Sequence, residues 1–241
     1  MSLIVFSPHL DDGVLSVSAQ LARPDALLLT VFGGVPPVET ARGSWDHLTG
    51  ASGCDRRQRE RLAENDAAAA ALGCGVENWN ELELQYRVEE LDRGGLTARI
   101  VSVLTDFDEI WVPAAVGGHP DHAVVRDLVL DAAQKTATRA QVRLHADLPY
   151  SIQFGWPSWV TGSTPDPYLD VDHWLSAELV EGGFDRDLLV PHVHALTGHE
   201  QDIKRRACDQ YRSQLPALLL DPRATSRWDA LLRFEVFWTF A

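Results

Sequence analysis

Short apolar runs alternate with segments of helical periodicity along most of the chain. Residues 3–6 form an apolar run that stops at Ser-Pro, and residues 13–21 then carry apolar side chains at helical spacing. Residues 26–32 are a second apolar run, which Gly33 and Gly34 end. Such a run is typical of a strand buried on both faces of a parallel sheet. We therefore predict a strand, a helix and a second strand within the first 32 residues.

The same alternation continues to about residue 146. Residues 56–72 are rich in alanine with interspersed Arg and Glu and stop at Gly73, so they predict a crossover helix. Later segments predict a helix over 96–104, a strand over 108–113, a helix from about 122 to 130 and a strand over 141–146. This order predicts a Rossmann-like α/β fold with three layers, α/β/α, and a mostly parallel sheet. In such folds ligands bind beyond the carboxyl ends of the strands.

Two stretches depart from this pattern. Residues 33–55 contain two prolines and several glycines without periodicity, and a loop of this length in a compact domain is usually functional or mobile. The last third of the chain is less regular. Because the sequence contains no repeat, no low-complexity segment and no convincing linker, we expect a single domain over residues 1–241.

Composition narrows the classes of function. The chain has 35 acidic and 21 basic residues, a formal net charge of −14, and no long Lys/Arg run. This argues against nucleic acid or an anionic membrane surface as a partner. No apolar run approaches the roughly 20 residues of a membrane helix, and the first residues lack the basic region of a signal peptide. Cys54, Cys74 and Cys208 are too scattered for a zinc knuckle or a disulfide framework. We expect a cytoplasmic protein with structural thiols.

Two polar clusters stand where predicted strands meet predicted helices. Residues 7–12 read Ser-Pro-His-Leu-Asp-Asp, and residues 119–122 read His-Pro-Asp-His. Both should lie at the carboxyl edge of the sheet. Histidine and carboxylate ligands that leave one position for water are typical of catalytic zinc sites, where the metal lowers the pKa of water to roughly 7. The clusters therefore predict a metal site.

The residues of these clusters also suffice for hydrolysis. His9, one of the paired aspartates and one of the paired histidines would supply three ligands. A remaining carboxylate could act as general base and a remaining histidine as proton donor. An aspartate at a helix start is by itself more often a cap, and a histidine at a turn is more often solvated. Two clusters at matching topological positions favour the metal site over these structural roles.

Together the motifs resemble the PIG-L or LmbE-like family, zinc-dependent de-N-acetylases that remove acyl groups from amino sugars and related metabolites. The usual opening motif of that family is Pro-His-Pro-Asp-Asp-Glu, and here Leu10 and Gly13 replace the second proline and the glutamate. The His-Pro-Asp-His motif is intact. Weaker matches are Arg61 with Glu64, and Lys204 followed by Tyr-Arg-Ser-Gln at 211–214. The resemblance spans roughly residues 3–214.

The resemblance implies one Zn²⁺ per chain, held by His9, Asp12 and His122. It assigns Asp11 as general base, and His119 as the group that stabilises the oxyanion or protonates the leaving amine. Asp121 would orient His119 or a ligand imidazole. Iron, cobalt or manganese would also accept such ligands. We expect catalysis to survive the loss of the glutamate, and we expect Gly13 to reshape the pocket, as in the branch of the family that acts on sugar-bearing natural products.

Residues for substrate binding are less well marked. Arg61 could bind sugar hydroxyls or a phosphate, or could face water from the surface of its helix. Trp45, in the long loop, could stack on a sugar ring or lie on a solvated loop. A third group of histidines is expected not to supply primary metal ligands: His192, His194 and His199.

The leading hypothesis is zinc-dependent hydrolysis of an N-acyl, chiefly N-acetyl, amide on an amino sugar or a glycosylated natural-product or thiol metabolite. The products are a free amine and acetate, and the partner is a small-molecule N-acylated sugar; homo-oligomerisation stays open. One alternative is an amidase for a larger conjugate. Another is a non-catalytic small-molecule binding protein, against which the retention of Asp11 and His119 argues. An oxidoreductase is disfavoured because the first turn lacks Gly-x-Gly-x-x-Gly and carries acidic groups.

Overall fold

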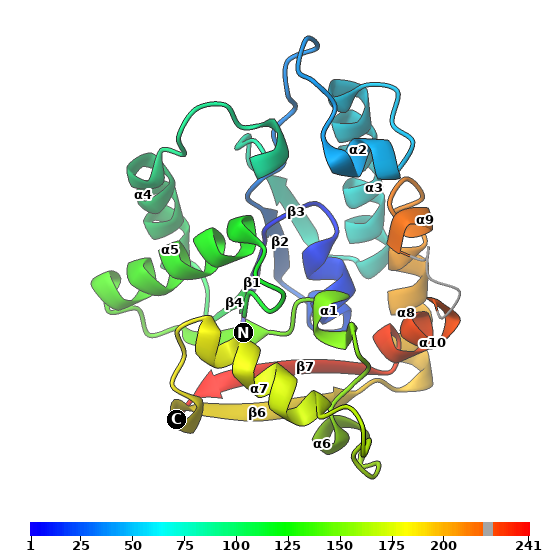
Figure 1. Ribbon diagram of the computed structural model, residues 1–241. Coiled ribbons are helices and arrows are strands. Elements are labelled where there is room, and N and C mark those ends of the chain that lie inside the picture. Colours follow the sequence, from blue (N-terminus) through cyan, green and yellow to red (C-terminus); the bar gives the residue numbers. More distant parts are fainter. Residues whose placement is uncertain (219–223) are drawn as a thin grey trace.

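A seven-stranded sheet runs through the middle of the computed structural model, which describes residues 1–218 and 224–241 (Figure 1). The strand order is β3-β2-β1-β4-β5-β7-β6. Five neighbouring strands are parallel: β3 (Gly75–Asn78), β2 (Ala26–Thr30), β1 (Leu3–Ser7), β4 (Glu109–Pro113) and β5 (Gln141–His145). Next to β5, β7 (Phe234–Phe240) runs in the opposite direction, and it pairs antiparallel with the edge strand β6 (Leu189–Ala195) as well. The predicted α/β fold with a mostly parallel sheet is therefore confirmed.

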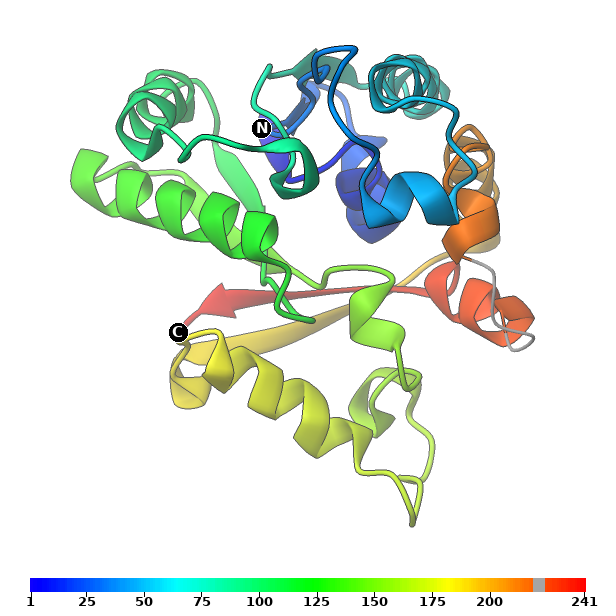
Figure 2. The same cartoon turned by 45° about the horizontal axis from the view of Figure 1, so that its top comes forward.

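Helices cover both faces of the parallel strands (Figure 2). On one face α8 packs against α1 and α3, and on the other α4 packs against α5. These longer helices are α1 (Asp12–Leu21), α3 (Cys54–Leu72), α4 (Arg93–Leu104), α5 (Pro120–Thr136) and α8 (Gly198–Cys208), while α7 (Val171–Glu181) lies beside β6 and β7. The shorter ones are α2 (Ser44–Leu48), α6 (Ser158–Thr161), α9 (Leu215–Leu218), α10 (Ala224–Leu231), η1 (Leu84–Tyr86), η2 (Tyr150–Ile152) and η3 (Arg186–Leu188).

The core lies between the sheet and these helices. Every residue of β1 and β4 is buried, as expected for central strands covered on both faces. Lys204 of α8 and Glu235 of β7 form an ion pair at 3.1 Å within the core, and Glu235 also accepts hydrogen bonds from the backbone N–H of Ala19. Lys204 therefore has a structural partner in the fold, which ties α8 to β7 and α1.

Three features were not predicted from the pattern of apolar residues. Strand β3 was missed because it is short and only half-buried at the sheet edge. The segment from 33 to 55 is not loop throughout, since it contains α2, where the Asp46 carboxylate accepts from the N–H of Gly43 at the helix start. The last third of the chain holds α7, α8 and two long antiparallel strands. Strand β6 alternates between half-buried and exposed residues along much of its length, so it lacks the continuous apolar run that marks the parallel strands.

None of the helices in residues 1–218 and 224–241 has the length and apolar character needed to cross a membrane.

Candidate active site

Both polar clusters lie at the carboxyl edge of neighbouring strands, β1 and β4. At the end of β1, the Ser7 hydroxyl accepts a hydrogen bond from the Gly13 N–H at 2.8 Å and donates to the His9 carbonyl. Asp11 occupies the N-cap position of α1, yet its side chain makes no capping hydrogen bond. The Asp11 carboxylate is therefore not used to stabilise the helix start, in contrast to the usual role of aspartate at this position.

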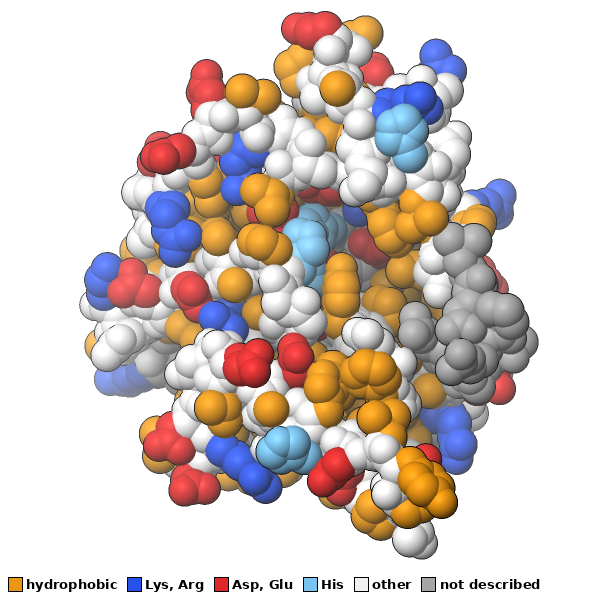
Figure 3. Space-filling view, in the orientation of Figure 1, with side chains coloured by type: hydrophobic (Ala, Val, Ile, Leu, Met, Phe, Trp, Pro, Cys, Tyr) orange, Lys and Arg blue, Asp and Glu red, His pale blue; other side chains and the backbone are white. Residues whose placement is uncertain are grey.

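A cavity of about 510 Å³ opens over this edge, and Figure 3 shows it as a hollow with imidazole and carboxylate side chains inside. Its polar lining comes from several elements: His9, Asp11 and Asp12 after β1, Ser44 and Trp45 of α2, Arg61 of α3, Glu83 and Gln85 around η1, and His119 and Asp121 before and in α5. Pro149, Tyr150, Ala217 and Leu218 contribute further wall. The fold thus brings the two predicted clusters, Arg61 and Trp45 into one pocket.

Three of the predicted site residues meet around one carboxylate oxygen. Asp12 Oδ2 lies 3.0 Å from His9 Nδ1 and 3.0 Å from His122 Nε2. The same oxygen accepts the backbone N–H of His9 at 2.9 Å, so the turn after β1 fixes its position. All three side chains are nearly or fully buried.

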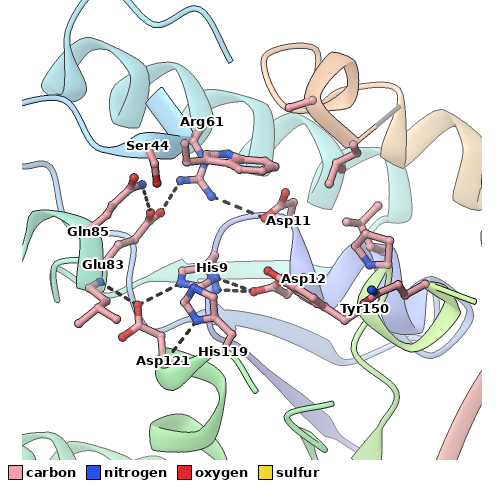
Figure 4. A pocket seen from close by; sticks show the side chains of 17 residues that line it. His9, Asp11, Asp12, Ser44, Arg61, Glu83, Gln85, His119, Asp121 and Tyr150 are labelled. Carbon is pink, nitrogen blue, oxygen red and sulfur yellow. Dashed lines mark hydrogen bonds and ion pairs between the residues drawn. The ribbon is translucent and has the colours of Figure 1, made fainter. Parts of the chain in front are cut away.

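The far nitrogen of each of these imidazoles faces another carboxylate. His9 Nε2 lies 3.1 Å from Asp121 Oδ2, and His122 Nδ1 lies 2.7 Å from Asp147 Oδ1 (Figure 4 shows the His9 pair). Because a carboxylate accepts hydrogen bonds, these contacts place the ring protons on His9 Nε2 and His122 Nδ1. The opposite nitrogens both face Asp12 Oδ2, where a bound cation would receive their lone pairs. Of the two roles expected for the Asp121 side chain, the structure favours contact with His9.

Asp147 was missed in the sequence. It follows the carboxyl end of β5, the strand next to β4, and so reaches the same edge of the sheet. Its Oδ2 also accepts the backbone N–H of Val116 in the loop that leads to His119. A carboxylate directly after the predicted strand over 141–146 was the available signal.

The donor set fits a divalent cation. Among the described residues, His9, His119 and His122 each offer a nitrogen, all within 4.8 Å of one another. His122 Nε2 is buried and makes no hydrogen bond of good geometry to any described residue. Ligand atoms around a tetrahedral zinc ion stand about 3.3 Å apart, close to the two 3.0 Å separations around Asp12 Oδ2. The imidazole and carboxylate donors match the preferences of zinc and of related divalent metals.

Charges around the cluster favour a cation as well. Burial lowers the pKa of His122, but the Asp12 and Asp147 carboxylates outweigh it and raise that pKa to about 9. Burial opposes ionisation of Asp12, yet the positive charge of His122 and the close contacts of both imidazoles hold its pKa well below the usual range. The cluster therefore keeps an ionised carboxylate and attracts positive charge.

Asp11 lies beside the cluster in a different environment. Burial and the charge of Asp12 raise the pKa of Asp11 to about 6, while Arg61, 3.6 Å away, and His9 act in the opposite direction. Arg61 also pairs with Glu83, so it bridges two carboxylates (Figure 4). A carboxylate whose pKa lies near neutrality can take up a proton without a large penalty.

His119 is prepared to donate a hydrogen bond. Its Nδ1 accepts the backbone N–H of Asp121 at 3.2 Å, which leaves the proton on Nε2. Burial and the positive charges of His9 and His122 lower the pKa of His119 to about 4, so this imidazole is neutral near pH 7.

Both predicted substrate-binding residues, Arg61 and Trp45, line the pocket. Neither takes the solvent-facing position that the alternative interpretation of the sequence allowed. Arg61 is only 3% exposed and points inward from α3 rather than facing water. Trp45 is half-buried, and its Nε1 donates to Gln214 Oε1 at 2.5 Å. Both side chains are therefore fixed by partners as well as exposed to the cavity.

Gly13 lies in a tightly packed part of the fold next to the site, and its effect on the shape of the pocket stays a prediction. It is not among the residues that line the cavity, and a Cβ at this position would lie 2.7 Å from Leu28 Cδ1 and 3.2 Å from Ser7. Glycine allows α1 to pack closely on β1 and β2 at this point. The glutamate of the usual motif would not fit this packing without movement of its neighbours.

The third group of histidines lies away from the cluster. His192 stacks on Phe237 and bonds to Thr239, and His194 pairs with Glu200. His199 is exposed near the start of α8. The three cysteines are free thiols, two of them buried.

The chain is similar to known proteins in sequence and in structure. A family model described as GlcNAc-PI de-N-acetylase, PIG-L, matches residues 4–133, a range that holds both motifs. No curated protein sequence matches the chain.

Several solved structures are similar over the whole chain. A deacetylase triple mutant from the teicoplanin biosynthetic pathway is 25% identical, with a TM-score of 0.76, and the match covers 100% of this chain and 98% of that one. The zinc-inhibited form of teicoplanin deacetylase is 22% identical, with a TM-score of 0.73 and the same coverage. The deacetylase of A40926 pseudoaglycone is 24% identical, with a TM-score of 0.72, covering 100% of this chain and 97% of that one.

Proposed function

Since the chain belongs to the PIG-L family of de-N-acetylases, we propose that it is a zinc-dependent hydrolase that removes an acetyl group from an N-acetylated amino sugar on a larger metabolite. The teicoplanin and A40926 pseudoaglycone deacetylases support a sugar-bearing natural product as the substrate class. The observation that carries the proposal is the Asp11 carboxylate, buried beside the His-Asp cluster and unused by the helix cap. A purely structural aspartate at this position would bond to the first turn of α1.

His9, Asp12 and His122 would hold one zinc ion per chain. The evidence for this set is the convergence of His9 Nδ1 and His122 Nε2 on Asp12 Oδ2. When bound, such a metal supplies a polarised carbonyl and a water of lowered pKa. Asp121 and Asp147 would hold the far nitrogens of the two imidazoles, so that each ring could present its other nitrogen to the metal.

Asp11 would act as the general base that accepts a proton from the attacking water. Its pKa near 6 leaves it ionised at neutral pH and still able to hold the proton afterwards. Arg61 keeps the carboxylate in place through its contact with Asp11 Oδ1.

His119 would donate a hydrogen bond from Nε2 to the oxygen of the tetrahedral intermediate. A neutral imidazole with a fixed proton is suited to this role, because the donor needs no reorganisation as charge develops. The proton taken up by Asp11 can then pass to the departing nitrogen. The amide C–N bond breaks, and the products are a free amine and acetate.

Arg61 and Trp45 would contact the substrate. Arg61 offers a guanidinium edge to sugar hydroxyls, and Trp45 offers an apolar ring to one face of the sugar. The cavity of about 510 Å³ is large enough for a sugar and part of the group that it is attached to.

The decisive experiment measures metal content and amide hydrolysis together. The parent, His122→Ala and Asp11→Asn would each be loaded with one equivalent of zinc, because a similar deacetylase is described in a zinc-inhibited form. We expect about one zinc per chain in the parent and in Asp11→Asn, and a clear loss in His122→Ala. Turnover of N-acetylated amino sugars should fall by at least about 10²-fold in Asp11→Asn.

Asp131→Asn, an exposed carboxylate paired with Lys135, is the matched control and should change neither quantity. Full turnover in Asp11→Asn with zinc bound would reject Asp11 as the base. Negligible zinc in both the parent and His122→Ala would reject the hydrolase mechanism. Hydrolysis of bulky acyl amides in preference to acetyl would instead favour the amidase alternative.

A further inference from the structure

One hydrogen bond joins two walls of the pocket that lie far apart in the sequence. Trp45 on α2 donates from Nε1 to Oε1 of Gln214, which directly precedes α9, at 2.5 Å. Trp45 lines the cavity, as do Ala217 and Leu218 of α9. Gln214 itself is fully buried, while Trp45 is half-buried, so the acceptor end of this bond is shielded from water.

The orientation of the Gln214 amide is determined by a relay that starts on α3. Both oxygens of the Glu64 carboxylate accept from Ser213, one from its N–H and one from its hydroxyl, each at 2.7 Å. Because the Ser213 hydroxyl proton goes to Glu64, Ser213 Oγ must accept, and it does so from Gln214 Nε2 at 2.7 Å. Gln214 Oε1 is thereby turned toward the indole, which can only donate.

Helix α2 depends on such contacts for its position. It has only five residues, too few to be stable alone. Its second anchor is Asp46, whose carboxylate accepts from the Tyr86 hydroxyl at 2.8 Å. The neighbouring residues Trp45 and Asp46 thus bind two separate parts of the fold. Of the two, Trp45 lines the cavity, and Gln214 is its partner.

We propose that Gln214 is a positioning residue that holds the Trp45 ring against the substrate, and that this bond sets how tightly the sugar-bearing substrate is bound. The inference rests on the proposed function. Among the described residues, Glu64, Ser213, Gln214 and Trp45 make no hydrogen bond to Asp11 or to the His-Asp cluster. Loss of the relay should therefore raise KM and leave kcat nearly unchanged.

The test uses two substitutions that remove the same bond from opposite ends. Trp45→Phe keeps an aromatic ring and loses the N–H, while Gln214→Met keeps the length and loses the acceptor, together with the Nε2 donor to Ser213. Each should raise KM by about twofold to tenfold, the range that one buried hydrogen bond allows, with kcat within about twofold of the parent. The double variant should show no larger effect than Gln214→Met alone, because the bond between Trp45 and Gln214 is already absent there.

Trp159→Phe is the matched control, since this indole is 39% exposed on α6 and does not line the cavity. It should leave KM unchanged. Additive effects of the two substitutions, or a fall in kcat at constant KM, would overturn the proposal.

A second measurement needs no substrate. Hydrogen exchange of the α2 amides should become faster in Gln214→Met than in the parent, while exchange of the α3 amides stays the same. If the parent hydrolyses no sugar amide, the proposed function fails, but this measurement still tests the role of Gln214. Unchanged exchange in α2 would refute that role even in an active enzyme, and Trp45→Phe provides the same measurement if Gln214→Met does not fold.

Discussion

Asp147→Asn should weaken zinc binding while leaving the three proposed ligands in place. In the structure Asp147 accepts two hydrogen bonds with separate oxygens, from His122 Nδ1 at 2.7 Å and from the Val116 N–H at 3.1 Å. Asparagine has the same shape, but one of its two ends donates. In either orientation of the amide, one N–H would face another N–H.

The size of the effect follows from the contact that is lost. If the amide N–H faces His122, the imidazole must carry its proton on Nε2, the atom 3.0 Å from Asp12. That nitrogen then has no lone pair for a metal. If the amide oxygen faces His122 instead, the Val116 N–H loses its acceptor and the loop before His119 loses an anchor. A buried hydrogen bond to a charged group contributes about 1.5–3 kcal/mol, which corresponds to a rise of about 10- to 150-fold in the zinc Kd.

The assay is a competition for zinc with a chromophoric chelator at about pH 7.5, accompanied by thermal unfolding of the metal-free protein. Asp131→Asn serves as the control for loss of one surface charge. A zinc Kd for Asp147→Asn within about twofold of the parent would refute the reasoning, because it would mean that the second nitrogen of His122 does not need a carboxylate partner. A protein that binds zinc weakly only because it is unfolded would be recognised by its melting curve.

Two further predictions concern stability. Gly13→Ala should lower the free energy of unfolding by about 1–3 kcal/mol, because its Cβ would lie 2.7 Å from Leu28 in the packed core. Urea titration should show this loss. The control Gly198→Ala should show none, because the space around Gly198 is open. Burial raises the pKa of Glu109, but its hydrogen bond to Arg23 and the charge of Arg143 outweigh this and lower it. The ionised Glu109 carboxylate therefore stabilises the fold above about pH 4.3, and this stabilisation is lost as the pH falls through the pKa of Glu109 in the folded protein. In urea titrations from about pH 5 to pH 3, Glu109→Gln should lose less stability than the parent. Parallel curves for the two proteins would contradict the assignment.

The local part of the site could be predicted because it depends on neighbouring residues. Apolar runs placed β1 and β4, and the turn after β1 brings His9, Asp11 and Asp12 together within four positions of the chain. The His-Pro-Asp-His motif begins α5, with proline at the first turn and His119 at the cap. Both motifs lie at one edge because parallel strands align their carboxyl ends. The sequence therefore determined the fold class and the residues that could bind a metal.

The tertiary structure decided which partner each of these side chains has. Asp147 reaches His122 only because β5 lies beside β4, and Glu83 reaches Arg61 from a segment 22 residues away. Arg61 stands on a helix whose low apolar periodicity gives no sign of which face is buried. Trp45 meets Gln214 across 169 residues, and β6 pairs with β7 without a continuous apolar run to mark it. Such contacts depend on the order of strands and the packing of layers, which combine distant segments, whereas residue spacing carries only the geometry of a single turn, helix or strand.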